Sequence, residues 1–93
     1  MTAYAIAMLR ITDAEKIAEY RTKAADALAQ HGGEVVHAAA GPKVLEGQPI
    51  VPDMIAVLRF PDTEAAEAWM ADPTLQDVHA LRRGAGSSDI LLF

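Results

Sequence analysis

The sequence predicts an α+β fold with the element order β, α, β, β, α, β. Three observations predict it: four segments have the apolar character of strands, two stretches repeat apolar residues at helical spacing, and the connections are short. This order is a split βαβ arrangement, in which four antiparallel strands carry both helices on one face of the sheet.

The first half of the chain begins with a strand over residues 3–11, which is apolar on both alternating faces. Thr12 to Glu15 has the spacing of a capping box. The helix that follows places residues at three- and four-residue steps: Ile17, Tyr20, Ala24, Ala27, Leu28 and His31. Gly32 and Gly33 end this helix.

A second strand is predicted over residues 34–40, and Gly41-Pro42 turns the chain away from it. A short apolar piece, Val44-Leu45, comes next. Residues 47–53 contain two prolines and no periodicity, which predicts a loop. The third strand covers residues 54–60 and is again apolar on both faces.

Pro61 breaks the third strand, and Asp62-Thr63 caps a helix that begins near Glu64. Asp72-Pro73 interrupts this helix, and because proline is tolerated at a first helical position, a second helical piece is predicted over residues 73–83. Residues 84–88 are predicted to be a flexible turn and residues 89–93 a final strand.

The length predicts a single domain over residues 1–93, which the order of elements makes ferredoxin-like. The composition and the sheet pattern predict a homodimer. The chain is 52% hydrophobic, but 19 of its 93 residues are alanine, which contributes little buried area. A thin core favours association. The helices leave one apolar face of the sheet uncovered, and a second copy of the sheet is the simplest cover.

Charge and cysteine content exclude several classes of protein. There is no cysteine, which excludes a disulfide framework, thiolate catalysis and cysteine-based zinc sites. The first ten residues lack the basic start and long apolar run of a signal peptide or membrane span, so we expect a soluble, cytoplasmic protein. The net charge of -5 disfavours nucleic acid and anionic membranes as partners. The three histidines are scattered, and we expect neither metal nor cofactor.

A set of short motifs resembles the domain-of-unknown-function family 1330, which belongs to the dimeric α+β-barrel superfamily. In chain order these are Tyr4, Asp13, Tyr20, Gly32-Gly33, Leu45-Glu46-Gly47, Phe60-Pro61 and Ala68-Trp69. The resemblance covers nearly the whole chain and implies a ferredoxin-like protomer whose sheet pairs with its twin to form a barrel. It implies no known reaction. Ala38 to Ala40, Met70 and Leu75 depart from the family pattern, so any pocket here has its own lining.

Trp69 and His79 have a spacing similar to the Trp and His pair of haem-degrading and antibiotic-biosynthesis monooxygenases in the same superfamily. Those enzymes also use a first-strand asparagine, and this chain has no asparagine. On one interpretation Trp69 and His79 are catalytic. On the other, Trp69 is a core residue that fixes a helix to the sheet.

His79 and Arg82 share one face of the second helical piece with Leu75 and Val78. They are candidates for a general acid or base and an anion clamp for a small carboxylate or enolate. The alternative is that His79 binds a neighbouring carbonyl while Arg82 reaches solvent or an acidic residue.

Tyr4, Tyr20 and His37 complete the ligand-binding candidates. Tyr4 and His37 sit on predicted strands, where a polar tip on an apolar body suits a cavity border as well as the sheet edge. Glu46 and Asp53 flank the predicted loop and are weaker candidates for a binding rim. His31, at a helix C-terminus, is expected to be structural.

Two functions stay open from the sequence. The first is a homodimer that binds a small apolar or anionic ligand. The second is a cofactor-independent monooxygenase or isomerase that acts on a small aromatic or carbonyl compound. The first is preferred because no complete catalytic set is visible.

Overall fold

The computed structural model describes residues 1–93 and contains four strands and three α-helices. Their bounds are β1 Ala3–Ile11, α1 Ala14–Ala29, β2 Glu34–Ala40, β3 Met54–Phe60, α2 Thr63–Ala71, the 3₁₀ turn η1 Pro73–Leu75, α3 Gln76–Gly84 and β4 Gly86–Leu92. The predicted order of elements is confirmed, with the second helical region divided at Asp72-Pro73 as expected.

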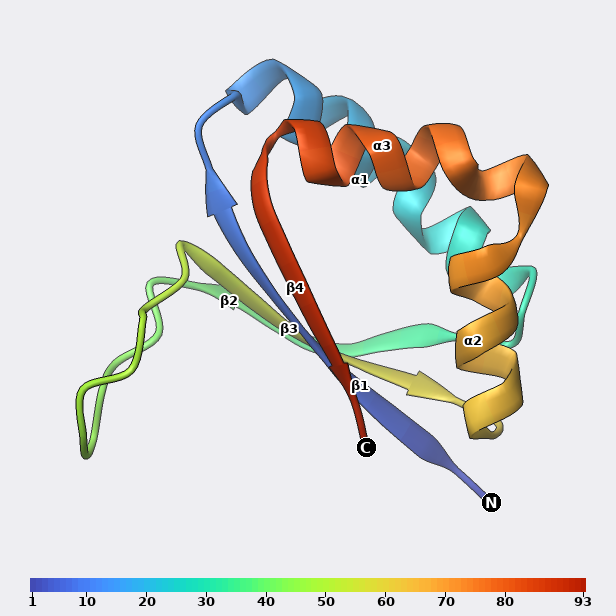
Figure 1. Cartoon of the computed structure of the whole chain (residues 1–93), viewed down its shortest axis with the longest axis horizontal. Helices are drawn as coiled ribbons and strands as arrows, with labels where there is room; N and C mark the ends of the chain where they lie inside the picture. Colours follow the sequence, from blue (N-terminus) through green and yellow to red (C-terminus); the bar gives the residue numbers. More distant parts are fainter.

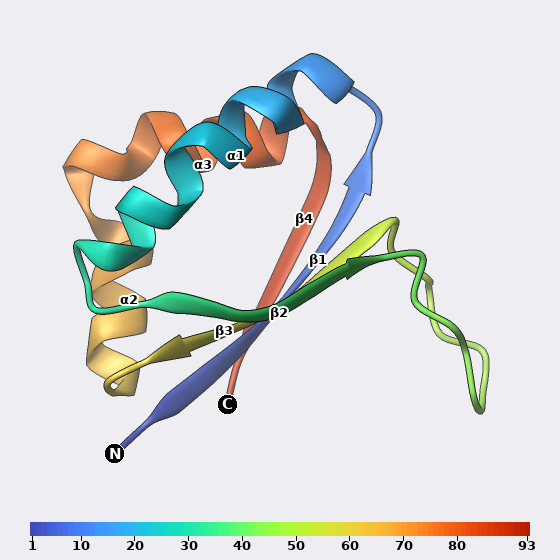
Figure 2. The ribbon, with the colours of Figure 1, turned by 180° about the vertical axis from the view of Figure 1, so that it is seen from behind.

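The strands form one antiparallel sheet in the order β2-β3-β1-β4. The helices all lie on one side of this twisted sheet, and both chain ends emerge near the same corner (Figure 1). Seen from behind, α1 runs across the sheet, and the other face of the sheet carries no helix (Figure 2). The predicted ferredoxin-like arrangement is thus confirmed.

Alternation along β1 assigns its residues to the two faces of the sheet. Ala3, Ala5, Ala7 and Leu9 are buried beneath the helices. On the opposite face, the three half-buried residues are Tyr4, Ile6 and Met8. The core under the helices is therefore built largely on small alanine side chains, as the composition predicted.

Aspartate side chains cap the beginnings of the helices. Asp13 accepts from the backbone N of Lys16 at 3.1 Å, and Asp62 accepts from Ala65 N at 2.7 Å. The capping box predicted from Thr12 does not form. Thr12 instead donates its hydroxyl to the carbonyl of Ala85 at 3.4 Å, because β4 begins close by.

The segment between β2 and β3 is one long loop over residues 41–53, and Val44-Leu45 does not form the extra piece predicted there. In both views this segment projects away from the body of the molecule (Figures 1 and 2). Val44 and Leu45 have no neighbouring strand to pair with, and Leu45 is 91% exposed.

β4 begins at Gly86, three residues before the predicted start, so the expected flexible turn over residues 84–88 is wrong. Gly86, Ser87 and Ser88 pair with Ile11, Arg10 and Leu9 of β1. The long β1 strand supplies backbone partners up to Ile11, and these hydrogen bonds override the turn-forming character of glycine and serine. None of the helices combines the length and apolar character needed to cross a membrane.

Candidate functional site

A cavity of about 220 Å³ lies between α1 and the sheet. Its floor is a row of alanines on three neighbouring strands, because Ala56 pairs with Ala7 on one side and with Ala38 on the other. Ala24 and Ala25 of α1 line it from above. Small side chains on both layers leave a space that larger core residues would fill.

The wall of the cavity is almost entirely apolar. Fourteen of its 16 lining residues are hydrophobic, and the two others are Arg21 and Arg82. Trp69 and Leu28 close the deep part, where both are buried. Val35, Ala38 and Ala25 are exposed, so the cavity opens to solvent between α1 and β2.

Arg82 of α3 is only 2% exposed. Its Nε donates to Ser88 Oγ at 3.0 Å, and its Nη1 donates to His79 Nδ1 at 2.9 Å and to the Tyr20 hydroxyl at 3.5 Å. The guanidinium carbon lies 5.4 Å from the Trp69 ring centre and 5.6 Å from that of Tyr20. All these partners are uncharged, and no carboxylate pairs with Arg82.

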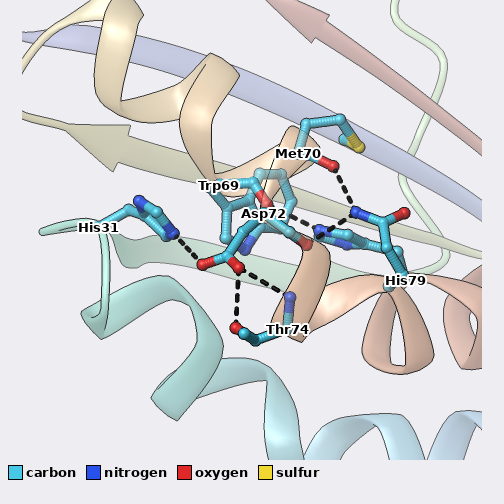
Figure 3. A network of polar contacts seen from close by, with 7 residues as sticks. His31, Trp69, Met70, Asp72, Thr74 and His79 are labelled. Atoms are coloured by element: carbon cyan, nitrogen blue, oxygen red, sulfur yellow. Dashed lines mark hydrogen bonds and ion pairs between the residues drawn. The ribbon is translucent and has the colours of Figure 1, made fainter.

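His79 is fully buried and uses both ring nitrogens. Its Nε2 donates to the Trp69 carbonyl at 2.9 Å (Figure 3). Its Nδ1 accepts from Arg82. This pair of bonds fits the neutral imidazole with its proton on Nε2. Burial lowers the pKa of His79 below its ordinary 6.5, and the positive charges of Arg82 and Arg83 lower it further. His79 does not line the cavity; it positions Arg82 against Trp69.

The lowered pKa of His79 predicts acid-sensitive stability. Because the unfolded chain takes up a proton near pH 6.5 while the folded protein does not, stability is complete above pH 6.5 and falls as the pH drops toward the folded pKa. One proton sets an upper limit of about 1.4 kcal/mol per pH unit on this slope. Urea unfolding at half-unit steps from pH 7.5 to 4.5 measures it.

His79→Gln is the test variant, because its amide keeps a donor for the Trp69 carbonyl but does not titrate. We expect this variant to lose the slope just below pH 6.5. Lys23→Gln, at an exposed position of α1 away from the uncovered sheet face, is the control and should keep it. An unchanged slope in His79→Gln would contradict the assignment.

Asp72 fixes the break that brings Trp69 and His79 together. Its carboxylate accepts from the Thr74 hydroxyl at 2.7 Å, from His31 Nε2 at 2.8 Å and from Thr74 N at 2.8 Å (Figure 3). These hydrogen bonds, led by that of the Thr74 side chain, lower the pKa of Asp72. With α2 ended there, the rings of Trp69 and His79 lie nearly perpendicular to each other at a centroid distance of 4.8 Å.

The structure brings together four of the six predicted site residues. Tyr20, Trp69 and Arg82 line the cavity, and His79 lies directly behind Arg82. The alternative interpretation of Arg82 does not hold, because it reaches neither solvent nor an acidic residue. The alternative for His79 is confirmed, because this histidine binds the carbonyl of Trp69.

Tyr4 and His37 lie elsewhere, on the sheet face that the helices do not cover. Tyr4 pairs with Arg59 and stacks on Phe93 at a centroid distance of 6.2 Å, and His37 pairs with Val57. The sequence places both on strands, but only the register shows which face each residue takes. His37 comes just after a bulge that interrupts the alternation of β2.

The weaker candidates are placed differently. Asp53 accepts from Ile11 N at 2.7 Å and so ties the long loop to β1. Glu46 is exposed in that loop. His31 has the structural role expected of it, as the partner of Asp72.

Sequence reasoning missed Arg21. It is four residues after Ile17 and seven before Leu28, which is the spacing of the inward stripe of α1. That spacing was the available signal.

Comparison with known proteins supports the fold. A protein of unknown function from Rhodopseudomonas palustris is 19% identical, with a TM-score of 0.78 over 99% of this chain and 80% of that one. SnoaB, a cofactor-independent oxygenase from Streptomyces nogalater, is 14% identical, with a TM-score of 0.72 over 99% and 90%. A protein of unknown function from Jannaschia sp. CCS1, described as dimeric and ferredoxin-like, is 17% identical, with a TM-score of 0.67 over 100% and 98%.

No curated protein matches the sequence. A family model, Domain of unknown function (DUF1330), matches residues 2–93. The resemblance found in the short motifs is thereby confirmed, and the chain belongs to the DUF1330 family.

Proposed function

We propose that the protein is a homodimer that binds a small, largely apolar molecule bearing an anionic group in the cavity between α1 and the sheet. The observation that carries this proposal is Arg82, a buried cation with only uncharged partners beside an apolar cavity. Burying an unpaired charge is unfavourable. A carboxylate that enters the cavity supplies the missing counterion.

The size and lining of the cavity limit the ligand. Cavities that hold drug-sized molecules are usually larger, at roughly 300–1,000 Å³, so a single ring or a short branched chain fits this one. The apolar wall packs against the body of the ligand. The guanidinium of Arg82 takes the carboxylate through charge-assisted hydrogen bonds, and His79 and Ser88 hold that guanidinium in place.

Replacing Arg82 tests the proposal. In Arg82→Met, a side chain of similar length removes the charge, and we expect the affinity for small aromatic and keto acids to fall by about tenfold or more, since hydrogen bonds to charged groups contribute about 1.5–3 kcal/mol. Thermal shift followed by calorimetric titration measures the change. An acid that stabilises Arg82→Met as much as the wild type would contradict the assignment.

Ala56→Leu is the second test variant, because it fills the alanine floor of the cavity and leaves Arg82 in place. It should also lose binding, while raising the stability of the unliganded protein or leaving it unchanged, because the added atoms fill an existing cavity. Loss of binding in both variants places the ligand in the cavity rather than on the surface.

The uncovered face of the sheet supports the proposed dimer. Ile6, Met8, Ile55 and Val57 stand together there by the register of β1 and β3. Leu91, paired with Ile6, is 62% exposed. An apolar patch of this kind favours a protein partner, and a second copy presents the same patch by two-fold symmetry.

Light scattering at micromolar concentration should give twice the 9.9 kDa chain mass. Val57→Glu places a charge at the centre of the patch and is expected to give a monomer. Ala18→Glu adds the same charge on the exposed side of α1 and should remain dimeric. A folded wild-type monomer under these conditions would refute the dimer.

The alternative function is catalysis without a cofactor on a small aromatic or carbonyl compound. The observation that favours it is the contact of Trp69, His79 and Arg82 at one end of an apolar cavity. Both nitrogens of His79 are occupied, so the Tyr20 hydroxyl is the group in the cavity wall that would transfer a proton. Dioxygen consumption with hydroxylated aromatic acids tests this function, and consumption that is unchanged in Tyr20→Phe would exclude that role.

A further inference from the structure

Arg21 occupies a position of α1 where an apolar residue is expected. The residues of the stripe that faces the sheet are Ile17, Tyr20, Arg21, Ala24 and Leu28, and all five line the cavity. The Nη2 of Arg21 lies 3.6 Å from Sδ of Met54, at the beginning of β3. The side chain therefore reaches from the helix toward the sheet while it stays exposed to solvent.

The two arginines are the charged residues of the cavity wall, and no acidic residue lines it. This is unexpected in a chain with 13 acidic and 8 basic residues. The ion pairs of the structure join Lys23 to Glu19, Arg59 to Glu34 and His31 to Asp72. Neither Arg21 nor Arg82 takes part in them.

The two arginine side chains of the cavity wall differ in solvent exposure. Arg82 is 2% exposed, whereas Arg21 is exposed and lies on the open side of the cavity with Val35 and Ala38. Arg82 donates to Ser88 and Arg21 contacts Met54, and both Ser88 and Met54 pair with Leu9, so the two contacts lie on opposite sides of β1. Two separated cations in one apolar wall match a ligand whose two charges are separated by an apolar body. Two like charges around one cavity also repel each other, and an anion beside each arginine relieves this repulsion.

We propose that the ligand is a small dianion, such as a dicarboxylate on a ring or short apolar spacer, with one anionic group on Arg82 and the other on Arg21. This inference rests on the proposed function, which assigns only the first contact. Arg21 then determines specificity, because it distinguishes dianions from monoanions of the same shape.

The test compares terephthalate with 4-methylbenzoate, which differ by a carboxylate in place of a methyl group. In the wild type, calorimetric titration should show terephthalate binding about fivefold more tightly, as expected of an ion pair at an exposed position. In Arg21→Gln the ratio should fall to about one. Arg21→Lys, which keeps the charge, should retain part of it. Added salt should reduce the wild-type ratio.

Lys23→Gln is the control, because Lys23 is an exposed cation of the same helix that pairs with Glu19 and does not line the cavity. It should keep the wild-type ratio. A wild-type ratio near one, with 4-methylbenzoate binding that depends on Arg82, overturns the dianion and leaves the proposed function intact. Absence of binding by both compounds overturns both proposals.

Discussion

Trp69→Ala is expected to lower the free energy of unfolding by about 3–5 kcal/mol, the usual cost of removing a buried tryptophan. Trp69 is 3% exposed and packs against Phe60 at a centroid distance of 5.6 Å and against His79 at 4.8 Å. Its loss enlarges the cavity and removes the ring over which Arg82 lies. For a chain of this length the melting temperature should fall by more than about 12 °C, measured by calorimetry at one fixed protein concentration.

Trp69→Phe separates packing from hydrogen bonding. The Trp69 Nε1–H is buried and has no hydrogen-bond partner, so phenylalanine loses no such bond and keeps a ring against Phe60. We expect a cost of about 1.5 kcal/mol or less. A Trp69→Ala variant no less stable than Trp69→Phe would show that the ring is not a core element.

Gly86→Ala should destabilise the protein by about 4 kcal/mol or more, at the upper end of single substitutions. Gly86 has a φ of +156°, and a Cβ at this position would lie 1.8 Å from the carbonyl oxygen of Arg10. That oxygen belongs to the backbone of β1, so it cannot move without opening the β1–β4 ladder. Urea unfolding measures the loss.

Gly47→Ala is the control for Gly86. Gly47 also has a positive φ, of 83°, but nothing lies within 4 Å of the added Cβ. Only backbone strain remains there, of order 1 kcal/mol. Equal costs at the two positions would show that the contact with Arg10 is not the cause.

Local signals were sufficient for most of the elements. The predicted bounds of β1, β2 and β3 agree with the structure, because the apolar run of β1 lies between threonines and those of β2 and β3 end at glycine, proline or aspartate. The interruption at Asp72-Pro73 was also predicted, since a capping aspartate followed by proline begins a new helical turn. The errors fell at Thr12, Val44-Leu45 and residues 84–88, where tertiary hydrogen bonds or their absence decided the outcome.

The sequence predicted part of the candidate site. It showed which residues share a helix face, but not which face of the sheet a strand residue takes. His79 and Arg82 were placed together because helical spacing fixes which residues share a face. Tyr4 and His37 were misplaced relative to the cavity, because a strand that is apolar on both faces gives no sign of which face the helices cover. The single-domain prediction for residues 1–93 stays a prediction.

The sequence by itself determined the order of the elements, the ferredoxin-like fold, the alanine-rich core and the shared face of His79 and Arg82, because these depend on periodicity and on residue type. Only the tertiary structure decided that Ala7, Ala38 and Ala56 line up across three strands and leave a cavity. It also decided that Arg82 is buried without an acid and that Arg21 lies at the opening. Such features depend on register and on the packing of α1 over the sheet, which join residues far apart in the chain.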